Sequence, residues 1–189
     1  DTARKAAARL GGALRHAPAL VRQLEAMGSF SLNSADALER LQHPLGIIQA
    51  LTEAGVGTPP PVVALDAVGA TAADEEAQDV LRFLVVDHKI AAAIEMRNGR
   101  FRAPASRVPV KARRAARRAS HALRLGLAGI DVVLKEDRAG VVAVTGSPLL
   151  TPFARLAEVD VAEAIIAAVE SHVQSWTRRT DDAAVPAER

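Results

Sequence analysis

The chain has 189 residues and a formal net charge of only +2, from 24 basic and 22 acidic side chains. Its apolar fraction of 49% suits one domain, or two small lobes that share a core. The absence of cysteine excludes disulfides and thiolate metal sites, and no apolar run approaches the roughly 20 residues of a membrane span. We therefore expect a protein of the cytoplasm.

The first part of the chain is predicted to be helical. A helix over residues 2–27 is expected to break at the pair Gly11-Gly12 and at Pro18, and to end at Gly28. Residues 30–32 are a candidate for a short strand. These elements form the beginning of a helical N-terminal region.

A second helical segment is expected to begin at Asn33 or Ser34, which can cap a helix, and to close at Gly55. Pro44 interrupts this segment, because it has no N–H to donate and its ring crowds the preceding turn. We expect either a kink or two short helices, the second starting at Pro44.

The rest of the chain alternates strands with helices. The predicted elements are strands over residues 62–65, 80–86, 90–95 and around Phe101, a helix over 109–125, strands over 127–134 and 141–145, and a helix over 161–176. The buried side of the last helix is predicted to carry Ile165, Val169 and Val173. Residues 66–78 indicate a linker or a frayed helix. Antiparallel pairs interleaved with helices predict an α/β fold of the α+β type.

The positive charge is concentrated in the helix predicted over residues 109–125. Its first part carries five cations within eight residues: Lys111, Arg113, Arg114, Arg117 and Arg118. One interpretation is a solvated helix face. The other is a docking surface for a polyanion, such as an acidic protein tail or nucleic acid. No aromatic side chains interleave with these arginines, so base stacking is unsupported.

Five segments together resemble the RimK-type (glutamate ligase) branch of the ATP-grasp superfamily. They lie in the order expected for that family: residues 9–12 with 21–34, residues 45–59, the strand pair 81–86 and 90–95, residues 122–131, and residues 159–166. Proteins of this family bind ATP between two lobes, phosphorylate a carboxylate and let an amine displace the phosphate. The resemblance implies an ATP-grasp-like C-terminal lobe with antiparallel strands and packed helices.

The resemblance also implies a missing central nucleotide-binding lobe. Only sixteen residues, none of them lysine, lie between Val63 and Val80, where the family has several dozen. We therefore expect three regions: a helical remnant and linker over residues 1–60, a truncated ATP-grasp-like domain over 61–177, and a disordered tail over 178–189.

The family's nucleotide and metal positions are largely replaced. The first nucleotide lysine corresponds to His43-Pro44. Asp131 matches the first metal ligand, but the glutamate and asparagine ligand positions are Ala143 and Thr145. Ser147-Pro148 matches the family's Ser-Pro, so no gap disturbs this correspondence. A single carboxylate is a poor Mg²⁺ site, so ATP and Mg²⁺ are expected only if a partner completes the site.

Two arginines are in register with family positions as remnants of a nucleotide or substrate site, Arg82 and Arg107. The alternative is that they form ordinary ion pairs with Glu95 or Asp131. Asp131 likewise has a simpler interpretation, as a hydrogen-bonding residue at the end of a strand.

Three functions follow from these patterns. The first is a non-catalytic ATP-grasp-like protein, a binding or regulatory subunit that forms homo-oligomers or pairs with an intact glutamate ligase acting in protein or cofactor modification. An acidic acceptor would suit its basic helix. The second is a divergent carboxylate–amine ligase whose site a partner chain completes. The third is polyanion or nucleic-acid binding through residues 111–124.

Overall fold

The computed structural model describes residues 16–58, 63–64, 79–98, 100–104, 107–135 and 138–183, with residues 63–64 and 176–183 described by their backbone alone. One mixed sheet organises this part of the chain, with strand order β1-β6-β5-β2-β3-β4. Neighbouring strands are antiparallel except β1 and β6, which are parallel. The strands are β1 Val63–Ala64, β2 Val80–Val86, β3 Lys89–Arg97, β4 Arg100–Arg102, β5 Leu127–Lys135 and β6 Arg138–Thr145.

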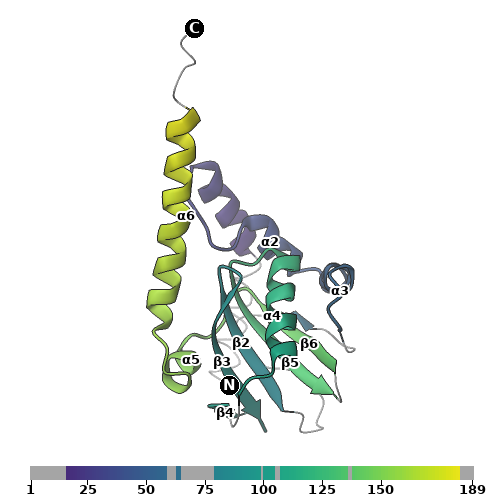
Figure 1. Ribbon diagram of the computed structural model, residues 1–189. Coiled ribbons are helices and arrows are strands. Elements are labelled where there is room, and N and C mark those ends of the chain that lie inside the picture. Colours follow the sequence, from purple (N-terminus) through teal and green to yellow (C-terminus); the bar gives the residue numbers. More distant parts are fainter. Residues whose placement is uncertain are drawn as a thin grey trace, which may run out of the picture.

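Helices cover both faces of this sheet (Figure 1). Residues 16–26 are helical, and the further helices are α2 Ala35–Arg40, α3 Pro44–Glu53, α4 Val110–Leu123, α5 Thr151–Leu156 and α6 Val161–Ala183. The predicted α+β order of elements is therefore confirmed. The sequence prediction missed α5, which places the buried ring of Phe153 against the sheet.

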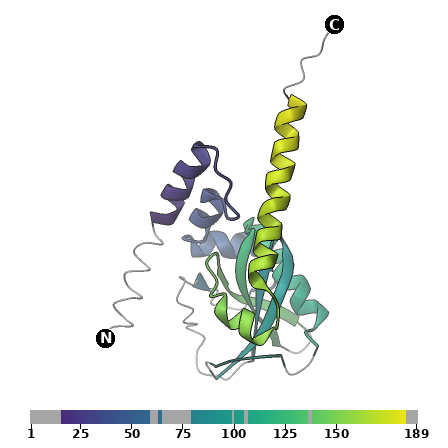
Figure 2. The same cartoon turned by 90° about the vertical axis from the view of Figure 1, so that its left-hand side faces the viewer.

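The main core lies between α4 and one face of the sheet. Small side chains recur along the buried side of α4, and they let the helix backbone lie close to the strands: Ala112, Ala115, Ala116 and Ala119. Phe83, Ile130 and Val132 reach this layer from the sheet. The opposite face carries Leu84, Ile94 and other apolar residues under α5 and the first half of α6 (Figure 2).

The second predicted helical segment forms two helices that are separated at Pro44. Ser34 caps α2 by accepting a hydrogen bond from Ala37 N at 3.2 Å, and Pro44 is the first residue of α3. Gly55 follows α3 with φ +64°, a conformation that glycine adopts without strain. The two-helix alternative and the closing glycine are both confirmed.

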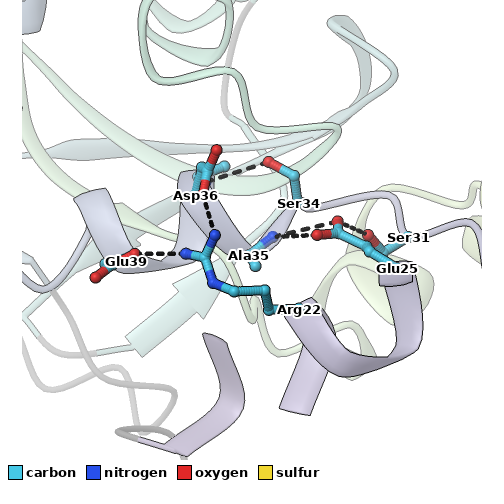
Figure 3. Close-up of polar contacts among 8 residues, drawn as sticks. Arg22, Glu25, Ser31, Ser34, Ala35, Asp36 and Glu39 are labelled. Atoms are coloured by element: carbon cyan, nitrogen blue, oxygen red, sulfur yellow. Dashed lines mark hydrogen bonds and ion pairs between the residues drawn. The ribbon is translucent and has the colours of Figure 1, made fainter. Parts of the chain in front are cut away.

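The helix over residues 16–26 attaches to α2 through polar contacts (Figure 3). Arg22 donates to Asp36 Oδ1 at 2.8 Å and to Glu39 Oε2 at 2.7 Å. Glu25 accepts from Ser31 Oγ at 2.7 Å and from the backbone N–H of Ala35. The arginine pairs are exposed, so they orient the two helices and contribute little free energy.

Four sequence predictions need correction. The first described helix runs through Pro18, where a break was expected. No strand forms over residues 30–32, and an isolated bridge joins Asn33 to Leu125 instead. The last helix continues past residue 178 to Ala183, so the expected tail begins too early. Val173 is 45% exposed, because α6 leaves the sheet after its first turns and projects away from it (Figures 1 and 2). The predicted break at Gly11-Gly12, the linker over 66–78 and residues 184–189 lie outside the described residues.

Candidate functional site

Asp131 lies at the centre of a row that crosses three neighbouring strands. Arg82 in β2 is directly opposite Asp131 in β5, and Ala143 in β6 is opposite Asp131 on its other side. Residues opposite one another in a sheet point to the same face. The alternation along β5 places this row on the face away from α4, because the neighbouring Ile130 and Val132 pack in the α4 layer.

Arg82 and Asp131 form a buried bidentate ion pair. Arg82 Nε donates to Asp131 Oδ1 and Arg82 Nη2 to Asp131 Oδ2, both at 2.6 Å. Their side chains are 9% and 2% exposed. The guanidinium carbon also lies 5.2 Å from the centre of the Phe101 ring. The ordinary ion pair expected as an alternative thus forms with Asp131, and both carboxylate oxygens are engaged by the arginine.

Glu95, the other carboxylate considered for Arg82, belongs to a different layer. It lies opposite Leu81 in β3, and Leu81 packs against the α4 core. Arg82 and Glu95 therefore point to opposite faces of the sheet. The row holds one acidic side chain that is already neutralised by its neighbour.

The remaining two metal-ligand positions supply no carboxylate. Ala143 is opposite Asp131 and has no donor atom, and Thr145 Oγ1 accepts from the backbone N–H of Ser147 at 3.1 Å. Throughout the described ranges, no group of three or more His, Asp or Glu side chains is arranged to hold a metal ion. Mg²⁺ prefers carboxylate and phosphate oxygens in octahedral geometry, so the described residues of this row do not fit Mg²⁺–ATP.

The structure does not bring Arg107 into the buried row. Arg107 is exposed, in the connection that leads from β4 to α4. The two candidate remnants of the nucleotide or substrate site are therefore in different settings: Arg82 is buried against Asp131, and Arg107 faces solvent.

The cations of α4 are exposed, and the fold divides them between surfaces. Three of them line a hollow of about 370 Å³ beside the end of α3 and the start of β6: Lys111, Arg114 and Arg118. Arg113 points elsewhere and lines a hollow of about 540 Å³ along β3. Arg117 lines neither of these hollows. The sequence indicated a single basic cluster, but only the neighbours of α4 decide which cations act together.

Two histidine contacts were not expected from the sequence, because the histidines lie far apart in it. His88 Nδ1 is 2.7 Å from Ser120 Oγ, and its ring stacks on His121. Burial lowers the pKa of His88 below 6.5, the charge of His121 adds to this, and Asp87 opposes it. His172 Nε2 lies 2.8 Å from Asp87 Oδ1, which joins α6 to the turn between β2 and β3.

Asp87 is also perturbed. Its partial burial raises the pKa, but the hydrogen bond and charge of His172, together with the charges of Lys89 and His88, outweigh this, so the pKa of Asp87 lies below its usual value. These contacts hold α6 against a hairpin turn. They assemble no nucleophile and no metal site in the described part of the chain.

No helix among the described residues is long and apolar enough to cross a membrane.

Comparisons with known proteins connect this site to one family. Several solved structures share the fold. ATP-grasp ligase PsnB, bound to a phosphomimetic variant of its minimal precursor, Mg and ADP, is 19% identical with a TM-score of 0.59, over 80% of this chain and 65% of that chain. Macrocyclase MdnB from Microcystis aeruginosa MRC is 16% identical with a TM-score of 0.52, over 72% of this chain and 58% of that chain. D-alanine–D-alanine ligase from Bacillus anthracis with ATP is 14% identical with a TM-score of 0.55, over 79% of this chain and 67% of that chain. The chain spans about two thirds of PsnB, from 65% to 68% in the PsnB structures compared.

No curated protein sequence matches this chain. The sequence model of the RimK-like ATP-grasp domain matches residues 70–169, which is more than half of the chain. That range contains β2 to β6, α4 and the Arg82–Asp131 pair. The chain therefore belongs to the RimK-like ATP-grasp family.

Proposed function

We propose that this chain is a non-catalytic member of its family, which acts as a binding or regulatory subunit of an intact carboxylate–amine ligase. The observation that carries this proposal is the closed Arg82–Asp131 pair. Where the family resemblance expects a metal-binding aspartate, the carboxylate is already neutralised and 2% exposed.

The energetics of the pair argue against its opening for a metal. Mg²⁺ binding would require Asp131 to release Arg82, and the freed guanidinium would stay buried without a partner. Breaking a buried pair in this way costs roughly 3–5 kcal/mol. The second carboxylate that would offset this cost is absent, because Ala143 occupies the opposite position.

A partner protein is supported by the surface. Large apolar side chains are exposed on the N-terminal helix, the loop after it and the outer side of α6: Leu20, Leu24, Met27, Phe30, Ile166 and Val173. Exposed apolar side chains of this size favour protein contacts. PsnB was solved with its precursor peptide, and MdnB is a macrocyclase. We therefore favour a partner ligase that modifies a peptide or protein, and oligomers that this chain forms with that ligase or with itself.

Nucleotide binding by the isolated chain tests the first half of the proposal. We expect isothermal titration with ATP and Mg²⁺ to give no saturable heat, and incubation with ATP to release no ADP. Micromolar binding, or ADP release above a buffer blank, would contradict a non-catalytic role.

A reconstituted assay distinguishes this role from the alternative in which two chains share a site. The chain is mixed with an intact RimK-like ATP-grasp ligase, and the ligase rate is measured. The double variant Arg82→Met/Asp131→Leu removes the only acid of the row and preserves its volume and charge balance. We expect this variant to change the ligase rate as the wild type does. If the wild-type chain raises the ligase rate and the double variant binds the ligase without raising it, the two chains share a catalytic site.

A further inference from the structure

The hollow beside α4 is separate from the Arg82–Asp131 row. Its walls come from the segment after α3, the first two turns of α4 and the start of β6: Gly55, Val56, Gly57, Val110, Lys111, Arg114, Ala115, Arg118 and Ala139. Val56 and Ala115 belong to the core between α4 and the sheet. The hollow and the ion pair therefore lie on opposite faces of the same sheet.

The described residues that line this hollow carry charge of one sign. Lys111, Arg114 and Arg118 are spaced by three and four residues, so they share one side of α4 over roughly 10 Å. All three residues are exposed, and none of the residues that line the hollow is acidic. Within the described ranges, neither Arg114 nor Arg118 is in an ion pair. Like charges one turn apart repel each other, and an anionic occupant would remove that repulsion.

The segment after α3 leaves Arg118 accessible to a ligand. Gly55 has no side chain, and a Cβ placed there would lie 3.9 Å from Arg118 Nη1. Gly57 bridges to Gly140, and Val141 N donates to Gly57 O at 2.8 Å, so this wall is anchored to β6. The arginine therefore stands beside a backbone wall whose position is fixed by the sheet.

The floor of the hollow distinguishes between kinds of anion. Val56, Val110 and Ala115 present apolar surface between the cations. A phosphate group or a nucleic-acid backbone would gain nothing from this surface, and no aromatic ring is present on which a base could stack. A peptide in which acidic and apolar residues alternate would use both parts. Its acidic side chains would repeat at about 7 Å, close to the separation of successive turns of α4.

We propose that this hollow binds an acidic peptide segment, with Arg114 and Arg118 holding carboxylates through paired N–H donors and Lys111 adding a third positive charge. This proposal does not depend on the role of the Arg82–Asp131 row, because the two sites use different residues on different faces. It assigns the basic helix to a protein ligand and uses three of its five cations.

Fluorescence anisotropy with a fluorescein-labelled (Glu-Val)₄ peptide tests the proposal. We expect saturable binding to the whole chain that weakens as salt is added. The variant Arg114→Gln/Arg118→Gln should lose about tenfold or more in affinity, because two charge-assisted contacts are removed. The matched control is Arg113→Gln/Arg117→Gln, which removes the same charge from the same helix outside the hollow and should stay within about twofold. Circular dichroism checks that both variants fold.

Four outcomes would overturn the proposal. Equal losses in the two double variants would mean that only net charge matters. Tighter binding of a labelled oligouridylate than of the peptide would favour a nucleic-acid surface. Complete competition by equimolar inorganic triphosphate would favour a phosphate ligand. A (Gln-Val)₄ peptide that bound as well as (Glu-Val)₄ would exclude recognition of carboxylates.

Discussion

Replacing Arg82 by methionine is expected to destabilise the fold severely. The substitution keeps most of the side-chain volume and a favourable contact with the ring of Phe101. It leaves the carboxylate of Asp131, whose side chain is 2% exposed, without the two 2.6 Å hydrogen bonds that neutralise it. Removing one partner of a buried pair costs roughly 3–5 kcal/mol. At about 2–4 °C per kcal/mol for a chain of this size, the melting temperature should fall by roughly 6–20 °C.

Urea denaturation followed by circular dichroism measures this change as a free energy of unfolding. The matched control is Arg97→Met in the neighbouring strand β3, whose ion pair with Asp79 at 2.9 Å is about half exposed. That substitution should cost less than about 1 kcal/mol. The double variant Arg82→Met/Asp131→Leu should recover most of the loss. A cost below about 1 kcal/mol for Arg82→Met alone would refute the interpretation of a closed, structural pair.

Two further predictions concern other parts of the fold. Because the pKa of His88 is lowered in the folded protein, the unfolded chain binds a proton more readily below pH 6.5, and the free energy of unfolding should fall as the pH drops through that value. His88→Asn tolerates the same left-handed backbone, φ +59°. In urea titrations at pH 7 and pH 5, this variant should show a smaller difference in the free energy of unfolding between the two pH values. An unchanged difference would mean that groups other than His88 cause the pH dependence. Gly126→Ala places a methyl group against the carbonyl oxygen of Leu32 and should cost about 1–3 kcal/mol. The control is Gly46→Ala in α3, where an added Cβ would lie 3.7 Å from the Cβ of His43. It should be neutral or stabilising when both variants are compared by thermal denaturation.

Local sequence signals predicted most of the secondary structure. Asp87 and His88 separate β2 from β3, because both tolerate the left-handed backbone of the turn. Pro44 separates α2 from α3, because it has no N–H to donate to the preceding turn. The errors have non-local causes. The sequence indicated Val173 as buried from periodicity alone, but it is 45% exposed, and the second half of α6 extends beyond the sheet (Figure 1). Residues 30–32 alternate apolar and polar side chains as a strand does, yet they pair with no strand of the sheet, and Asn33 after them bridges Leu125.

The candidate site divides in the same way. The spacing of twelve residues between Asp131 and Ala143 was enough to predict that the glutamate position is lost, and the strand register places the two residues opposite one another. The sequence left open whether Arg82 and Arg107 pair with Glu95 or with Asp131. The strand register answers this for Arg82, because side chains on adjacent strands meet only when they point to the same face. Arg82 and Asp131 point to one face of the sheet, and Glu95 points to the other.

The sequence by itself determined that the chain is an α+β member of the RimK-like family with five cations on one helix, since residue identity and spacing carry that information. Only the tertiary structure decided which side chains act together. The fold pairs Asp131 with Arg82. It also places Lys111, Arg114 and Arg118 around one hollow and Arg113 beside another. The physical reason is that contacts between residues distant in the chain depend on strand register and helix packing, which no local pattern specifies.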